Sequence, residues 1–162
     1  MTEDTRPVVV AFDGSPEAVA AVHAAATLFR DRVLVVVTVW EPGMAMTAAM
    51  LPFGGAGAGS YVPPPPQDVK AVDEAQFEHA QAAAEAGARL ATEAGATAEA
   101  LPVPDSADVA DTIAAIADQR DAAALVVGSR GMGRVKSAFV GSTSRRLLQD
   151  TSRPLLVVRA PG

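Results

Sequence analysis

The chain of 162 residues contains no cysteine, which excludes a disulfide framework and a metal site built on thiolates. Aromatic residues are scarce, since there are only one Trp, one Tyr and five Phe, so the core must be built from Val, Leu, Ile and Ala. The first residues lack the apolar stretch of a signal peptide. The apolar runs are too short to span a bilayer. The length predicts a single domain over residues 1–162. The absences predict that it is located in the cytoplasm and has no membrane role.

Acidic residues are nearly absent from one part of the chain. The net charge is −6, yet seven of the 13 basic residues lie between Arg130 and Arg159, where Asp150 is the only acid. A local cationic region in an acidic protein favours a small anionic ligand over nucleic acid, which usually requires a broad basic face. The alternative interpretation is that some of these arginines only form a solvated helix face.

Residues 42–67 contain no charge at all and are rich in Gly, Pro and Met. Proline and glycine at this density predict a long loop rather than a helix or a membrane span. Two interpretations of the loop stay open: a cover over a ligand or partner, and a mobile insertion without a binding role.

The remaining chain alternates short apolar runs with amphipathic segments. The runs at residues 8–12, 33–39, 97–103, 123–127 and 155–158 are expected to be strands. Helices are expected to begin at Ser15-Pro16, Asp68, Asp105-Ser106 and Ser142, with the second ending near Ala94 and the last near Gln149. Continuous apolar strands that alternate with helices indicate an α/β domain, with a parallel sheet covered by helices on both faces.

The glycine pattern Gly128-x2-Gly131-x9-Gly141 follows directly on the fourth expected strand. Glycine after a buried strand allows a tight turn and a close approach of backbone N–H groups to a ligand. The hydroxyl run that starts at Ser142 then opens a helix, whose first N–H groups have no partner within the helix. Such groups, together with the positive end of the helix dipole, attract anions. The segment therefore predicts a phosphate-binding site.

The spacing G-x2-G-x9-G-[S/T] between the last two strands resembles the ATP-binding universal stress protein family. The opening Val-Ala-Phe-Asp13-Gly-Ser-Pro-Glu and the closing Arg-Pro154-Leu-Leu-Val-Val-Arg also resemble that family's first and last strands. The resemblance covers the whole chain except the 42–67 loop. It implies a doubly wound, five-stranded parallel sheet of order 3-2-1-4-5, of the adenine nucleotide alpha hydrolase-like fold. Strands one and four are then neighbours, and a ligand is expected in the crevice beyond their carboxyl ends.

The resemblance also implies which residues bind a nucleotide. Ala11 and Asp13 would line the nucleoside, and Val39 would meet adenine through its backbone. The phosphates would be held by Gly128, Ser129, Arg130, Gly131, Met132, Gly133 and Arg134, and then by Gly141, Ser142 and Thr143. From the residues alone, Asp13 could equally be a turn acid and Val39 plain core. The chain departs from the family at Arg134, where members often carry glycine, and at Ala138, where some carry a basic residue.

The expected ligand is ATP, with Mg²⁺ held mainly by the phosphates and not by protein side chains. No Walker A motif is present, and no residue is placed to orient water for attack on a γ-phosphate, so any hydrolysis should be slow. His23 and His79 lack the second ligand that a zinc site needs. The favoured function is an ATP-binding stress or regulatory protein whose conformation or assembly responds to nucleotide. The alternatives are a slow ATPase and a structural dimer that binds another nucleotide, such as cyclic AMP.

The last expected strand, Leu155–Val158, would lie at the edge of the sheet with unpaired backbone groups. In the family that the chain resembles, this strand commonly mediates a homodimer. A homodimer through this edge is therefore expected.

Overall fold

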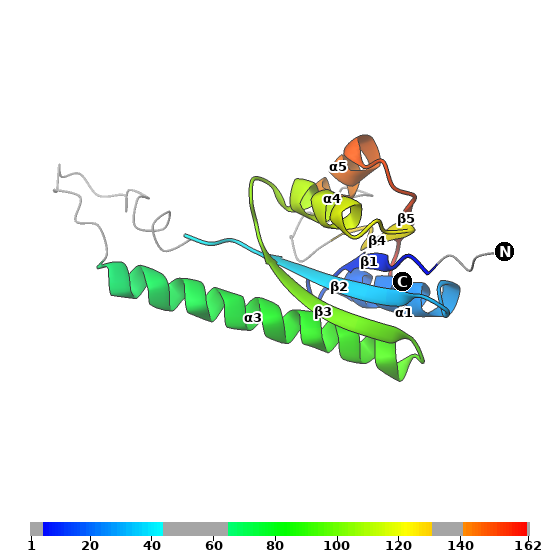
Figure 1. The fold of residues 1–162 in the computed structure, drawn as a ribbon, viewed down its shortest axis with the longest axis horizontal. Coiled ribbons are helices and arrows are strands. Elements are labelled where there is room, and N and C mark those ends of the chain that lie inside the picture. The colour runs from blue at the N-terminus through cyan, green and yellow to red at the C-terminus, as the bar shows by residue number, and fades with distance from the viewer. Residues whose placement is uncertain (1–4, 44–64, 131–140, 162) are drawn as a thin grey trace.

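The computed structural model describes residues 5–43, 65–130 and 141–161. Its centre is a single parallel sheet of five strands in the order β3-β2-β1-β4-β5 (Figure 1). The strands are β1 (Val8–Ala11), β2 (Val33–Trp40), β3 (Thr97–Pro104), β4 (Ala124–Gly128) and β5 (Leu155–Val158). The predicted strand order and the parallel arrangement are therefore confirmed.

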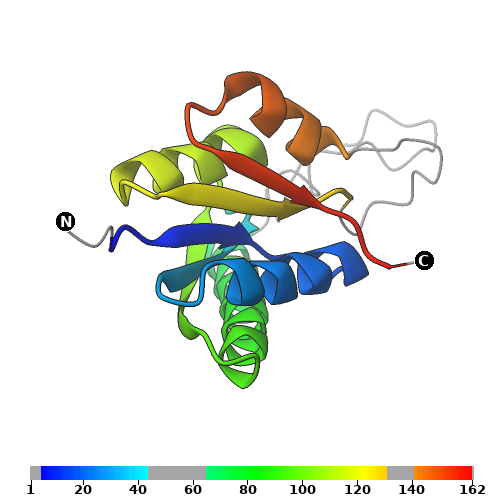
Figure 2. The ribbon, with the colours of Figure 1, turned by 90° about the vertical axis from the view of Figure 1, so that its right-hand side faces the viewer.

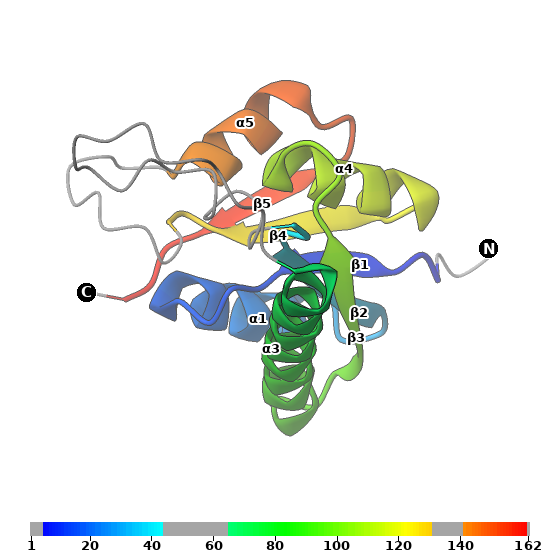
Figure 3. The same cartoon turned by 90° about the vertical axis from the view of Figure 1, so that its left-hand side faces the viewer.

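Helices cover both faces of the sheet, as Figures 2 and 3 show from opposite sides. The helices are α1 (Pro16–Leu28), α3 (Pro66–Glu93), α4 (Val109–Gln119) and α5 (Ser142–Asp150). Helices α1 and α3 pack on one face, and α4 and α5 pack on the other. The predicted doubly wound architecture is confirmed.

The strands divide their side chains between two apolar clusters. Val8 and Val10 of β1 contribute to the cluster beneath α1, whereas Val9 between them contributes to the cluster beneath α4. This alternation follows from the period of two residues in a strand. Most buried apolar residues are Val, Leu, Ile and Ala, as the composition predicts, and Phe12 is the one aromatic residue among the buried hydrophobic residues described.

Two helix starts differ from the predictions. Helix α3 begins at Pro66, inside the stretch assigned to the 42–67 loop, because proline is well tolerated at the first helical position. Helix α4 begins at Val109 and not at Asp105. Asp108 is its N-cap, since its carboxylate accepts a hydrogen bond from the N–H of Ala110 at 2.8 Å. The rest of the predicted loop, residues 44–64, lies outside the described residues.

An arginine connects the segment before β5 to the end of α4. The Arg153 guanidinium contacts the carboxylates of Asp118 and Asp121, each at 2.7 Å, and the carbonyl of Ala122 at 3.1 Å. The hydrogen bond from Arg153 holds the pKa of Asp118 below its ordinary value. This connection fixes the edge strand to the helix that precedes β4.

None of the helices in the described ranges combines the length and the hydropathy that a membrane crossing requires.

Candidate functional site

The middle of the sheet contains the point where the chain winds in opposite directions. Strands β1 and β4 are hydrogen-bonded neighbours, with Val10 opposite Val126. The chain leaves β1 toward α1 on one face, and α5, which follows β4 in the chain, packs on the other face (Figure 2). The loops that follow two such strands border a crevice, which is the usual ligand site of a doubly wound sheet. The structure therefore brings the segments after residues 11 and 128 together at the carboxyl ends of the strands.

The loop after β1 is a turn held by its own side chains. Asp13 is exposed, and its Oδ1 accepts a hydrogen bond from the N–H of Ser15 at 2.9 Å. Gly14 adopts φ +80°, which favours glycine. The buried Ser15 caps α1, because its hydroxyl accepts a hydrogen bond from the N–H of Ala18 at 3.1 Å. The predicted nucleoside residue Asp13 thus stands on a well-defined turn beyond the carboxyl end of β1.

Gly128 ends β4 in close contact with the start of α1. A Cβ atom on Gly128 would lie 2.8 Å from the backbone carbon of Glu17 and 3.0 Å from the N of Ala18. Real Cβ atoms essentially never come within 3.0 Å of another heavy atom. Glycine is needed here for the close approach of strand and helix, whatever ligand the loop binds.

The backbone of Ser129 is fixed by neighbours on two sides. Its N–H donates to the carbonyl of Val158 at 2.6 Å, and its carbonyl accepts from the N–H of Gly141 at 2.6 Å. The hydroxyl of Ser144 on α5 donates to the carbonyl of Gly128 at 2.7 Å. Ser129 itself is buried. The start of the glycine segment is thus attached to both β5 and α5, which brings the predicted residues 128–129 and Gly141 together.

The predicted residues at the start of α5 are accessible. Ser142 is exposed and Thr143 is half-buried, and they form the first turn of the helix. Gly141 is the N-cap and has no side chain to accept from the helix N–H groups. Gly131, Met132, Gly133 and Arg134 lie outside the described residues, so their predicted contacts with phosphates stay predictions.

An ion pair joins the glycine segment to α1. Nη2 of Arg130 lies 3.0 Å from Oε1 of Glu17, and the Glu17 side chain is only 11% exposed. Sequence reasoning placed Arg130 at the site but missed Glu17. Its single signal was an acid in the first turn of a helix, which is common and does not indicate a contact with a residue so far along the chain.

The residues expected near the base lie at the ends of β1 and β2. Ala11 and Val39 are half-buried and pack against the apolar cluster beneath α4. Their side chains therefore contribute to the core, and the predicted contact between the Val39 backbone and a base stays a prediction.

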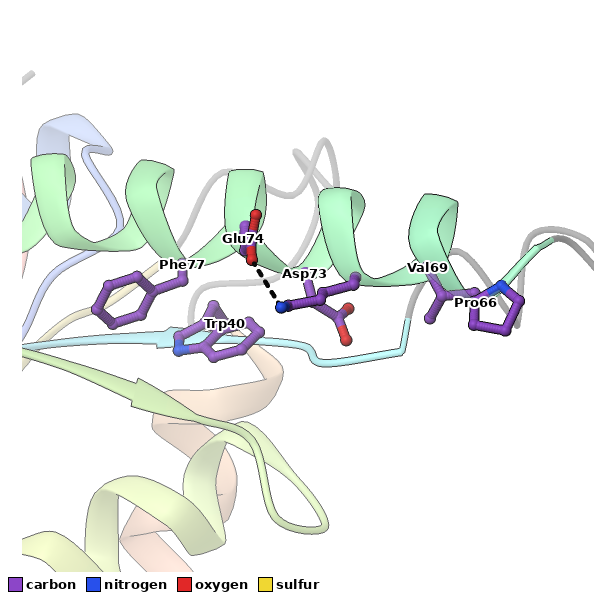
Figure 4. Close-up of a pocket in the computed structure, with 7 residues that line it drawn as sticks. Trp40, Pro66, Val69, Asp73, Glu74 and Phe77 are labelled. Carbon is purple, nitrogen blue, oxygen red and sulfur yellow. Dashed lines mark ion pairs between the residues drawn. The ribbon is translucent and has the colours of Figure 1, made fainter.

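A pocket of about 400 Å³ lies between Trp40 at the end of β2 and the first half of α3 (Figure 4). The ring of Trp40 meets the ring of Phe77 edge to face, with the ring centres 6.0 Å apart. The pocket is lined by Trp40, Pro66, Val69, Lys70, Asp73, Glu74 and Phe77. None of these residues was predicted to bind a nucleotide.

Within residues 5–43, 65–130 and 141–161, no group of three or more His, Cys, Asp or Glu side chains is arranged to hold a metal ion.

The sequence model of the universal stress protein family matches residues 58–159 of this chain. No curated protein matches the chain by sequence.

Solved structures share the fold. A universal stress protein from Archaeoglobus fulgidus is 23% identical with a TM-score of 0.65, over 94% of this chain and 97% of that one. A universal stress protein in complex with cAMP is 20% identical with a TM-score of 0.63, over 98% of this chain and 100% of that one. The Archaeoglobus fulgidus protein in complex with dAMP is 19% identical with a TM-score of 0.62, over 96% and 99%. At these identities, the likeness establishes the fold.

Proposed function

Because this chain belongs to the universal stress protein family, we propose that it binds an adenine nucleotide in the crevice beyond β1 and β4. The proposed role is regulatory: binding changes the conformation or the assembly of the protein during stress. The observation that carries the proposal is the convergence of the Asp13 turn, the Gly128–Arg130 segment and the first turn of α5 at one edge of the sheet. Family proteins of the same fold have been solved with cAMP and with dAMP.

Each segment would contribute different chemistry. The exposed carboxylate of Asp13 can accept hydrogen bonds from the hydroxyl groups of a ribose. Arg130 and the N–H groups at the start of α5 would attract the phosphates. We propose ATP as the ligand, with Mg²⁺ held mainly by its phosphates. The N–H groups of Ser129 and Gly141 already bind carbonyl groups, so the remaining phosphate donors would come from later residues of the segment and from α5.

The direct test is to identify the nucleotide that the protein carries. The purified protein is denatured and the released nucleotide is identified by mass spectrometry, followed by calorimetric titration with ATP-Mg, cAMP and dAMP. Recovery of ATP supports the proposal. Recovery of cAMP, or tighter binding of cAMP, favours the alternative of a dimer that binds another nucleotide. Multiple turnovers of ATP at a useful rate would favour an enzyme.

One substitution tests the predicted phosphate segment itself. Gly131→Val is expected to abolish ATP binding without unfolding the protein, because a branched side chain would block the close approach of the phosphates. Ala115→Val, at an exposed position of α4, is the matched control and should bind like the unmodified protein. Unchanged ATP affinity in Gly131→Val would contradict the assignment.

We also propose that the protein forms a homodimer through β5. This strand lies at one end of the sheet order, so no strand of the described residues pairs with its outer edge. An unpaired edge is a template for a second strand.

A further inference from the structure

The guanidinium of Arg130 forms an ion pair with the carboxylate of Glu17. The two groups are 3.0 Å apart, and the Arg130 side chain is 47% exposed while that of Glu17 is 11% exposed. A phosphate that approaches Arg130 therefore meets a guanidinium that is already paired with a carboxylate.

The structure gives Glu17 little freedom to move away. It lies in the first turn of α1, where the helix dipole favours a negative charge. Its backbone packs directly against Gly128. If a phosphate pulled Arg130 away, a mostly buried carboxylate would lose an ion-pair partner, and uncompensated buried charges are costly. Arg130 must therefore be shared between Glu17 and the ligand, or be withdrawn from Glu17 at a cost.

We propose that Glu17 is a specificity-determining residue that limits the attraction of Arg130 for phosphate. This inference rests on the proposed nucleotide site and assigns a selectivity to it. Because Glu17 offsets the charge of Arg130, each additional phosphate charge on the nucleotide gains less affinity than it would from an unpaired arginine. The site consequently tolerates nucleotides with few phosphate charges, and adenosine binding does not depend on Glu17.

The test is a double-mutant cycle read out by calorimetric titration with adenosine, AMP and ATP-Mg. The proteins are the unmodified chain, Glu17→Gln, Arg130→Gln and the double variant. Glu93→Gln, an exposed residue at the end of α3, is the control that removes the same charge elsewhere. Thermal unfolding of each variant checks that it is folded.

The expected result is a change in the ratio between the Kd of adenosine and the Kd of a phosphorylated nucleotide. The ratio of the adenosine Kd to the AMP or ATP Kd should rise about three- to tenfold in Glu17→Gln, as expected when a charge-assisted contact is released. The adenosine Kd itself should stay the same. Arg130→Gln alone should lower the ratio, because it removes the cation and leaves the Glu17 carboxylate unpaired beside the phosphates. In the Arg130→Gln background the substitution of Glu17 should raise the ratio less than it does in the unmodified protein, because no arginine is left to be released.

Several outcomes would overturn the inference while leaving nucleotide binding intact. An unchanged or lower ratio in Glu17→Gln would mean that Glu17 does not restrain Arg130. An equal rise in the Arg130→Gln background would mean that Glu17 repels phosphate directly. An unchanged ratio in Arg130→Gln alone would mean that Arg130 does not attract phosphate, and this variant decides the matter if Glu17→Gln does not fold. If the unmodified protein binds none of the three ligands, the proposed function falls, and this inference with it.

Discussion

The residues at the proposed nucleotide site fall into two groups, since some hold the loops and others are exposed where the ligand is proposed to bind. Asp13 is exposed and accessible, whereas Gly128 is constrained by the helix that packs against it. The neighbours of a Cβ at Gly128 are backbone atoms of Glu17 and Ala18 and the Cβ of Glu17, which cannot move as the far end of a side chain would. Gly128 is therefore a packing requirement as well as part of the predicted phosphate segment.

Gly128→Ala is expected to destabilise the protein by about 1–3 kcal/mol, the usual cost of forcing an extra carbon into a packed contact. Chemical denaturation gives the free energy of unfolding. Gly14→Asn is the matched control in the neighbouring loop, because a Cβ there meets nothing within 4 Å and Asn tolerates the φ of +80°. Equal, small losses in both variants would contradict the close packing of β4 on α1.

At this scale, local patterns were predictable and distant contacts were not. Ser15 as N-cap followed by Pro16 is a pattern of neighbouring residues, and the structure confirms it. The pair of Glu17 and Arg130 joins residues from two ends of the chain, and no spacing rule connects them. The predicted start of α4 at Asp105-Ser106 was also wrong, since Asp108 is the N-cap. Asp105 instead accepts a hydrogen bond from the hydroxyl of Thr112 at 2.9 Å.

At the scale of elements, arginines attach α5 and the segment before β5 to acids on α4 and just after it. Arg146 on α5 contacts Asp111 on α4 at 2.9 Å, and Arg153 contacts Asp118 and Asp121 at the end of α4. These pairs hold α5 and the start of β5 against α4. The sequence indicated a basic region here, and the structure shows that part of it neutralises acids of a neighbouring helix.

The Arg153 contacts predict a pH dependence of stability. The pKa of Asp118 is lower in the folded protein than its ordinary value, so the pair contributes stability above the unfolded pKa. This contribution is lost as the pH falls through the folded value, below about pH 4. Arg153→Gln should therefore lower the melting temperature at pH 7, and the difference from the unmodified protein should shrink toward pH 3. Arg89→Gln, at an exposed position of α3, is the control. A difference that stays constant with pH would contradict the role of Asp118.

Element types were predictable because most of the strands are continuous apolar runs. Three of the five strand predictions differ from the structure by one residue at one end, the fourth strand is shifted by one residue at both ends, and Leu155–Val158 coincides with β5. The start of α3 was harder to predict, because the proline run before it is compatible with both a loop and a helix start.

For the whole molecule, the order of the strands came from the family resemblance and not from periodicity. The runs of β1, β2 and β4 are apolar on nearly all positions of both faces, so the pattern predicts buried parallel strands but not their neighbours. Once the order is known, β1 and β4 border the crevice and β5 becomes an outer strand. The position of the site and the proposed interface between two copies therefore depend on the same arrangement.

The geometry of β5 allows the proposed dimer to be tested without unfolding the domain. The carbonyls of Pro154 and Val158 face β4, where they accept hydrogen bonds from Leu125 and Ser129. Because backbone groups alternate along a strand, the N–H of Val157 faces away from β4 and that of Leu156 faces toward it.

Val157→Pro is therefore expected to remove a donor from the outer edge, which proline tolerates in edge strands, and to give a monomer by light scattering. Leu156→Pro is the matched control: it removes a donor that faces β4 and should lower the melting temperature instead. The proposed interface requires a dimer for the unmodified protein at micromolar concentration. A monomeric unmodified protein, or a Val157→Pro variant that stays dimeric and folded, would place any assembly elsewhere than at β5.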